Sequence, residues 1–248
     1  MTISKIHAAT TQAASAASIR KSALLAATLA LAVVGAGAAS AAKAPGLKAF
    51  NATYDVSYMG LGGTATMSLA PIGGDRWRYS LEIGSAVATL NQDTTFEAND
   101  GQWRPLSNSD SSSLLIKKNK RTARYDWDKR EASWSGDVKP ERAGPVALKD
   151  GDLDAMLLNL AIPRDLVAGK PLHYRMVDNG RARELEYTVA GADTVEVGGA
   201  TRKATKVSRR TGDKEQIVWV VEGLPVPARI LQREDGEDEM DLKLKSIR

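Results

Sequence analysis

The sequence predicts a mainly β domain of antiparallel strands with one helix, built as a barrel, an open barrel or a β-roll. Apolar and polar residues alternate along most of the chain after residue 49, as they do in strands with one buried face. Glycine-containing turns separate the alternating runs, which favours antiparallel neighbours. A single segment, about residues 152–166, has helical spacing instead.

The first 42 residues have the three parts of a cleavable export signal. An uncharged run rich in Ala, Leu and Val spans residues 22–37, and small residues at 38–42 place cleavage after Ala41 or Ala42. The run is shorter than the roughly 20 apolar residues of a membrane span. The part before it carries basic residues and no acid: Lys5, Arg20 and Lys21. We therefore expect a periplasmic protein without a transmembrane segment after cleavage.

Removal of this segment changes the charge of the protein. Three of the 34 basic residues and none of the 30 acidic residues lie in it, so 31 basic and 30 acidic residues remain, a net charge of +1. This balance gives no support to a nucleic-acid partner, which needs a clustered basic surface. We expect a linker at 43–48 and one β-rich domain at 49–248, which is long enough to bury a core without disulfides.

The strands follow one another along the chain. Alternation over 50–58, 65–69 and 77–83 predicts a meander, and 122–127 with 132–135 predicts a hairpin. We expect a loop or an exposed strand at 107–113 and a solvated turn at the basic run 117–121. Asn179-Gly180 is the strongest hairpin signal. The remaining predicted strands are 171–177, 183–189, 194–197, 204–209, 216–221, 226–232 and 240–247.

The predicted helix carries an apolar stripe at helical spacing, formed by Leu153, Met156, Leu157 and Leu160. Asp150 or Asp152 is the expected N-cap, because a carboxylate there accepts from unpaired N–H groups. Pro163 and Gly169 are expected to limit its C-terminal end. We expect the stripe to pack against the sheet.

Few residues suited to catalysis are present. After residue 42 the chain has no cysteine and one histidine, His173, in an alternating strand. A zinc site of His and Cys, a cysteine nucleophile and an iron–sulfur cluster are therefore excluded within one chain. No Gly-x-Ser-x-Gly elbow accompanies His173. We predict no catalytic residue, no metal ligand and no cofactor. Paired carboxylates leave a carboxylate-dependent periplasmic hydrolase open as an alternative.

Aromatic residues are the candidates for ligand binding. Trp77 and Tyr79 share a face with aliphatic residues, so we expect them in the core. Tyr125, Trp127 and Trp134 flank a charged turn, and we take them, with Leu157 of the helix, as candidate ligand-binding residues. Filling the core is the alternative role for these side chains.

Three stretches give the chain a resemblance to a known family. They are an Asp/Leu-rich segment at 151–158, a glycine-turn hairpin at 195–207 and a Trp-to-Leu-Pro strand pair at 219–229. With the opening strand at 50–58, they resemble the domain-of-unknown-function 3108 family of exported Gram-negative proteins. Met156-Leu157 stands where that family often has small or polar residues. The resemblance implies a β-rich periplasmic domain and brings no activity or catalytic residues.

These observations favour a periplasmic, non-enzymatic binding or cell-envelope accessory protein that holds an apolar or lipid ligand in a curved sheet. Two alternatives stay open beside it. One is the hydrolase, and the other is a scaffold that contacts only other envelope proteins.

Overall fold

The structure is a computed structural model that describes residues 46–58, 60–86, 88–114 and 117–248. The predicted signal segment 1–42 and its cleavage site lie outside the described residues. No helix in the described ranges is long and apolar enough to cross a membrane.

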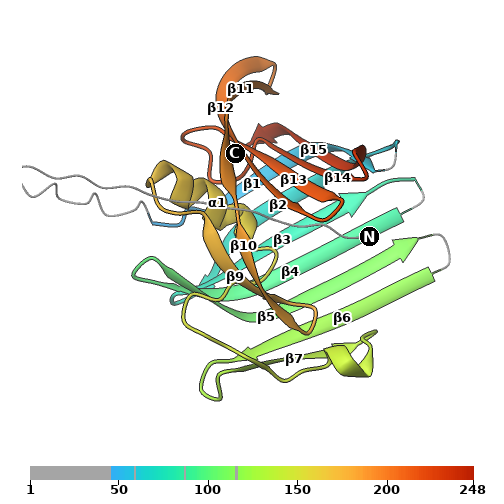
Figure 1. Cartoon of the computed structure of the whole chain (residues 1–248), viewed down its shortest axis with the longest axis vertical. Helices are drawn as coiled ribbons and strands as arrows, with labels where there is room; N and C mark the ends of the chain where they lie inside the picture. Colours follow the sequence, from blue (N-terminus) through green and yellow to red (C-terminus); the bar gives the residue numbers. More distant parts are fainter. Residues whose placement is uncertain (1–45, 59, 87, 115–116) are drawn as a thin grey trace, which may run out of the picture. The chain divides into compact units, whose positions relative to one another are not determined.

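One large antiparallel sheet dominates the described domain (Figure 1). Its first eight strands are β1 (Phe50–Tyr58), β2 (Leu61–Gly73), β3 (Arg76–Gly84), β4 (Ala88–Asn99), β5 (Gln102–Leu114), β6 (Lys117–Asp126), β7 (Glu131–Gly136) and β8 (Val146–Ala147). Its last five are β11 (Thr188–Val197), β12 (Ala200–Thr211), β13 (Lys214–Val220), β14 (Arg229–Glu234) and β15 (Glu237–Ile247).

Neighbouring strands of this sheet are also consecutive strands of the sheet along the chain, except at one position. β15 pairs with β1, so the last strand lies beside the first and the order runs from β11 through β15 and β1 to β8. The sheet is not closed, because β11 and β8 stand at its two ends. The predicted antiparallel fold is therefore confirmed in its open form.

Two elements cover one face of the sheet, which we call the inner face (Figure 1). They are α1 (Leu158–Val167) and the separate hairpin of β9 (His173–Asp178) and β10 (Arg181–Glu186). The hairpin turns at Asn179-Gly180, as predicted, with both residues at positive φ. A 3-10 turn, Pro140–Arg142, precedes β8.

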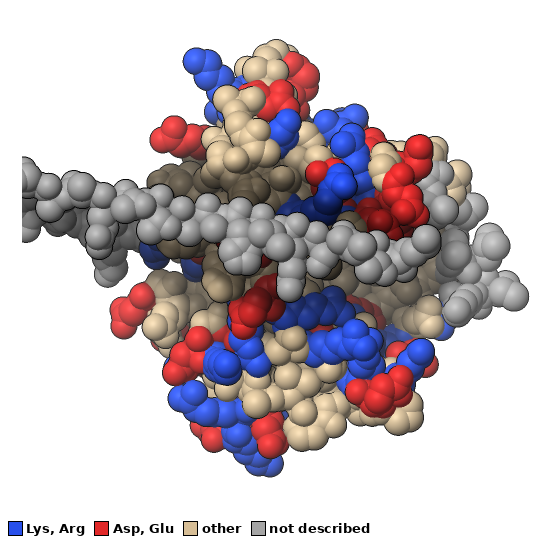
Figure 2. Space-filling model, viewed as in Figure 1, with Lys and Arg blue, Asp and Glu red and all other residues tan. Residues whose placement is uncertain are grey.

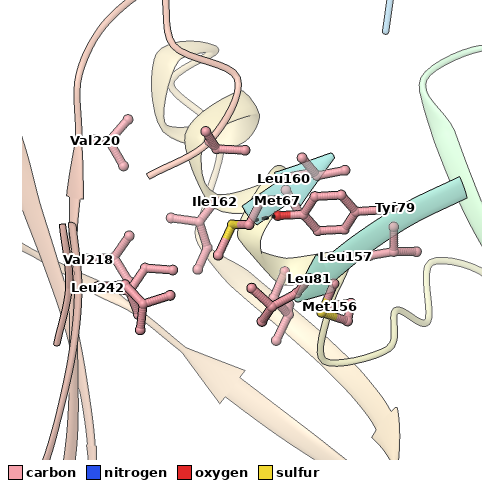
Figure 3. Close-up of a cluster of buried hydrophobic side chains, with 14 of the residues drawn as sticks. Met67, Tyr79, Leu81, Met156, Leu157, Leu160, Ile162, Val218, Val220 and Leu242 are labelled. Atoms are coloured by element: carbon pink, nitrogen blue, oxygen red, sulfur yellow. Dashed lines mark hydrogen bonds between the residues drawn. The ribbon is translucent and has the colours of Figure 1, made fainter. Parts of the chain in front are cut away.

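The main core lies between α1 and the inner face (Figure 3). Leu157 is fully buried near Tyr79, whose hydroxyl donates to the Met67 sulfur at 3.2 Å. Ile162 points to the opposite part of the curved sheet, where Val218 lies (Figure 3). The sheet thus wraps around the helix, and the whole predicted apolar stripe of the helix is buried.

The outer face carries a smaller apolar cluster over β12–β14. Its buried members are Ala204, Ile217, Trp219, Val221, Ala228 and Leu231. Arg229 lies over the Trp219 ring, with the guanidinium 4.6 Å from the ring centroid. The same guanidinium donates to both carboxylate oxygens of Asp241, at 2.8 and 2.9 Å.

The helix starts later than predicted, at Leu158, and Asp150 and Asp152 do not cap it. Asp152 instead accepts from the N–H of Lys149 at 2.8 Å, which favours a turn. The backbone of Leu153 bonds to β9, donating to Arg175 O and accepting from Val177. These bonds hold residues 152–154 in a non-helical conformation.

The expected end of the helix was only half correct. Pro163 lies inside α1, where its missing N–H removes one helical hydrogen bond without ending so short a helix. Gly169 follows the C-cap with a φ of 64°, a conformation that suits glycine at this end.

The basic run 117–121 is not the predicted solvated turn but the start of β6. The polar stretch 107–113 belongs to β5, which is the strand alternative of the prediction. Cross-strand pairs explain this, since Arg121 lies opposite Asp110 and contacts its carboxylate. Polar side chains on these strands satisfy one another, so the segment needs no apolar alternation to be a strand.

Candidate functional site

Apolar side chains on one part of the inner face are not buried. Tyr58 and Leu61 are direct cross-strand partners and are 45% and 54% exposed. Ile83, Leu90 and Met240 belong to the same face and are partly exposed. They belong to five neighbouring strands, β15 and β1–β4, and Ile83 and Met240 pack against the edge of the main core. This part of the inner face, defined by these five residues, is here called the apolar shelf.

The apolar shelf follows from the strand lengths. Val56 and Leu242 are directly paired core residues, and Tyr58 and Met240 are the next pair along the same face. The strands therefore carry their alternation two residues past these buried positions. In the view onto the inner face, charged side chains gather over β5–β7 and near the turn between β14 and β15 (Figure 2).

A buried polar cluster lies next to the core. The carboxylate of Asp154 accepts hydrogen bonds from the Thr94 hydroxyl and from the N–H of Leu157, the latter at 2.9 Å. Thr94 in turn accepts from the Asn108 side chain at 3.1 Å. All three side chains are buried, so this cluster joins the segment before α1 to β4 and β5.

The burial of Asp154 changes its acidity. Removal from water raises its pKa to about 7, although the hydrogen bonds from Thr94 and Leu157 lower it. The nearby carboxylates of Asp178 and Asp110 raise it further. A carboxyl with this pKa can donate or accept a proton near neutrality, but Asp154 has 1% of its surface exposed.

Asp110 and Asp178 share the Arg121 guanidinium, which lies in contact with Asp110 and 4.0 Å from Asp178. Burial raises the pKa of Asp178, and Arg121 opposes that shift. The single guanidinium therefore compensates the charge of one of the two carboxylates. The three side chains form an ion-pair network between β5, β6 and β9.

The structure brings three of the predicted ligand-binding residues together. Tyr125 and Trp134 are buried in edge-to-face contact, with ring centroids 6.2 Å apart, and Trp127 packs partly exposed against their cluster. Tyr125 donates to Val177 O at 2.9 Å, and Trp127 donates to Pro105 O at 2.7 Å. Leu157 lies apart from them, in the main core. Their role in ligand binding stays a prediction.

His173 lies exposed on β9, with Nε2 3.4 Å from a Glu184 carboxylate oxygen. Its surroundings are those of a solvated strand residue. Within residues 46–58, 60–86, 88–114 and 117–248, no group of three or more His, Asp or Glu side chains is arranged to hold a metal ion.

The sequence did not single out the apolar shelf or the Asp154 cluster. Alternation assigns Tyr58 to the apolar face of its strand, but it does not show where the covering helix ends. The Thr94–Asp154 contact joins residues 60 positions apart, and no local pattern indicates it.

Comparison with solved structures gives only a likeness of fold. A β-barrel-like protein of the domain of unknown function DUF1849 from Brucella abortus is 12% identical, covers 81% of this chain and 97% of that chain, and has a TM-score of 0.48. A MucB structure is 13% identical, with coverage of 84% and 55% and a TM-score of 0.36. The MucA/MucB complex of Pseudomonas aeruginosa gives 13% identity, coverage of 81% and 51%, and a TM-score of 0.37.

The chain spans about half the length of the matched chains in the two MucB structures. At these identities and TM-scores, the three structures carry no argument about function. No protein of curated function matches the sequence.

The model of one protein family matches residues 53–243, from β1 into β15. Its description is "Protein of unknown function (DUF3108)". The match includes the three stretches on which the resemblance was based, together with the apolar shelf and the buried Asp154 cluster. The chain belongs to the DUF3108 family.

Proposed function

We propose that this is a non-enzymatic binding protein of the periplasm, which holds the apolar part of a lipid on the apolar shelf. The observation that carries this proposal is the exposure of Tyr58 and Leu61 on a sheet face that is elsewhere core. Burial of this exposed apolar surface under a ligand favours binding by about 25 cal/mol per Å². The export signal predicted at 1–42 supports the compartment.

The shelf also has the right access for such a ligand. Tyr58 and Leu61 adjoin the turn between β1 and β2, so they lie at an end of the sheet rather than in its centre. A lipid chain can reach them without displacement of α1. By contrast, a ligand at Leu157 would have to displace core residues, because that side chain has no exposed surface.

Lipid extraction from the exported protein tests the proposal. Protein purified from periplasm without detergent is analysed by native mass spectrometry, and its organic extract is analysed for acyl chains. We expect lipid bound to the wild type and clearly less on Leu61→Asp. A wild type that carries no lipid and takes none up from a membrane lipid extract would contradict the proposal.

A carboxylate-dependent hydrolase is favoured by one observation, the pKa of Asp154 near 7. That carboxyl is buried and already bonded to Thr94 and Leu157, so a substrate cannot reach it in this conformation. His173 is not among the hydrogen-bond partners of Asp154 and lies exposed beside Glu184. We therefore assign the raised pKa to structure, and expect His173→Ala to leave the cellular role intact.

A scaffold role has a different basis, the edge of the sheet at β11. This strand pairs with β12 on one side, and most of its residues are exposed. A free edge can accept an extended segment of another protein by strand addition. Capture of an envelope peptide that protects the β11 amides from hydrogen exchange would support this second role.

A further inference from the structure

A row of six directly paired residues crosses six strands on the inner face. From β12 to β2 its members are Arg209, Gln216, Gln232, Met240, Tyr58 and Leu61. Cross-strand partners share a face, and the next row inward contains the core residues Val207 and Val218. With strands about 4.8 Å apart, the five steps span about 24 Å along the sheet.

The chemistry of the row changes steadily from one end to the other. It begins with a guanidinium, continues with two side-chain amides, and ends with a thioether, a phenol ring and an aliphatic chain. Every member is partly or largely exposed. The apolar end belongs to the apolar shelf, so the shelf continues into a polar stretch that ends at the Arg209 guanidinium.

The partners of the Arg209 guanidinium, Thr211 and Tyr187, are both neutral side chains. Its Nη1 donates to Thr211 Oγ1 at 2.9 Å, and the guanidinium lies 5.7 Å from the centroid of the Tyr187 ring. Its Nε atom is buried without a hydrogen-bond partner. Within the described part of the chain, no carboxylate forms an ion pair with Arg209, whereas Arg210 beside it lies 3.6 Å from Glu215.

The side-chain amide of Gln216 lies beside this cation and is oriented by Tyr187. Its Oε1 accepts from the Tyr187 hydroxyl at 2.6 Å, which leaves its Nε2 group as a donor. A negatively charged group here would meet the uncompensated charge of Arg209 and the amide of Gln216 together. Hydrogen bonds with a charged partner are among the stronger ones in proteins.

We propose that the row binds an amphiphile with one acyl chain and an acidic head group, the head group at Arg209 and Gln216 and the chain along Met240, Tyr58 and Leu61. This inference rests on the proposed function and adds the charge of the ligand and its direction across the strands. Gln232 lies between the two parts, opposite Gln216 and Met240.

Calorimetry with two matched lipids tests the inference, at concentrations below those at which either forms micelles. Lauroyl lysophosphatidylglycerol and monolauroylglycerol share one chain but differ in head-group charge. The variants are Arg209→Gln and the control Arg210→Gln, whose side chain belongs to the outer face by strand alternation. Glycerol phosphate, an acidic head group without a chain, is the third ligand.

We expect the wild type to bind the acidic lipid more tightly than the neutral one, by a margin that salt reduces. Arg209→Gln should weaken the acidic lipid about tenfold and leave the neutral lipid unchanged. Arg210→Gln should change neither. Glycerol phosphate should bind far more weakly than the acidic lipid.

Two results would overturn the inference and leave the proposed function standing. One is equal affinity for both lipids that Arg209→Gln does not alter, and the other is an equal loss of both lipids in Arg209→Gln. Glycerol phosphate that binds as tightly as the acidic lipid would mean an anion site without a lipid chain. If the wild type binds neither lipid, the proposed function fails as well.

Discussion

The carboxylate of Asp154 and the hydroxyl of Thr94 meet in a hydrogen bond that joins the segment before α1 to the middle of the sheet. Both side chains are fully buried. Asp154 also accepts from the N–H of Leu157, immediately before the first helical residue. This one carboxyl therefore fixes the position from which α1 enters the core, and its protonation state bears on the stability of the domain.

Stability should fall as the pH rises from about 4 to about 7. The pKa of Asp154 is about 7 in the folded protein and 3.8 as the ordinary value, so the folded state binds more protons between these limits. The free energy of unfolding then decreases with rising pH until the native carboxyl is also ionised. Thermal unfolding between pH 4 and pH 8 measures this decrease.

Asp154→Asn should remove most of this dependence, because an amide does not ionise and can still bond to Thr94 and Leu157. A residual slope is expected from Asp178, whose pKa is also raised by burial. Asp128→Asn, an exposed turn variant, serves as the control and should keep the wild-type profile. An Asp154→Asn profile that parallels the wild type would show that the carboxyl is ionised throughout.

Leu157→Ala should lower the free energy of unfolding by about 2–5 kcal/mol, because Leu157 is fully buried and its truncation leaves a cavity. Denaturant unfolding gives the value. Val167→Ala, in the same helix at 60% exposure, should cost less than about 1 kcal/mol. A similar cost for the two variants would mean that α1 is not packed as described.

Arg229→Lys should destabilise the domain by about 1–2 kcal/mol. Lysine keeps the charge but loses the bidentate hydrogen bonds to Asp241 and the cation–π contact with Trp219. Arg233→Lys is the matched control, since its pair with Asp238 is largely exposed and exposed pairs contribute little. Equal melting temperatures for both variants would argue against a structural role for the buried pair.

The exported protein should begin at Ala42 or Lys43. The reason is the pattern of small residues at 38–42 after the apolar run. N-terminal sequencing of protein from the periplasmic fraction gives the first residue directly. A mature form that retains residues 24–34 would contradict the export signal.

Local patterns predicted those parts of the fold that depend on local spacing. Alternation located β1, β3, β7 and the β9–β10 hairpin, because a half-buried strand repeats every two residues. The stripe from Leu153 to Leu160 was correctly predicted to be buried, although three of its four residues precede α1. Asp152 and Asp154 bond to the backbone there, and such bonds compete with a helix.

Features that depend on distant partners were not predictable in this way. β5 and the start of β6 are polar. Their pairing is supported by ion pairs between cross-strand partners such as Arg121 and Asp110. The row from Arg209 to Leu61 exists only through the registers of five strand pairs, including the pairing of β15 with β1. A single sequence gives the face of each residue within its strand, but not its neighbours across the sheet.

Binding of a neutral apolar probe to two variants of the same strand tests the central claim most directly. Leu61→Asp and Ile72→Asp both place a charge at an exposed apolar residue of β2, at 54% and 41% exposure, but only Leu61 lies on the apolar shelf. The fluorescence of N-phenyl-1-naphthylamine reports the binding, and equal melting temperatures confirm that both variants are folded. We predict that Leu61→Asp loses most of the wild-type probe affinity while Ile72→Asp retains it. Equal probe binding by the wild type and both variants would contradict a lipid site on the apolar shelf.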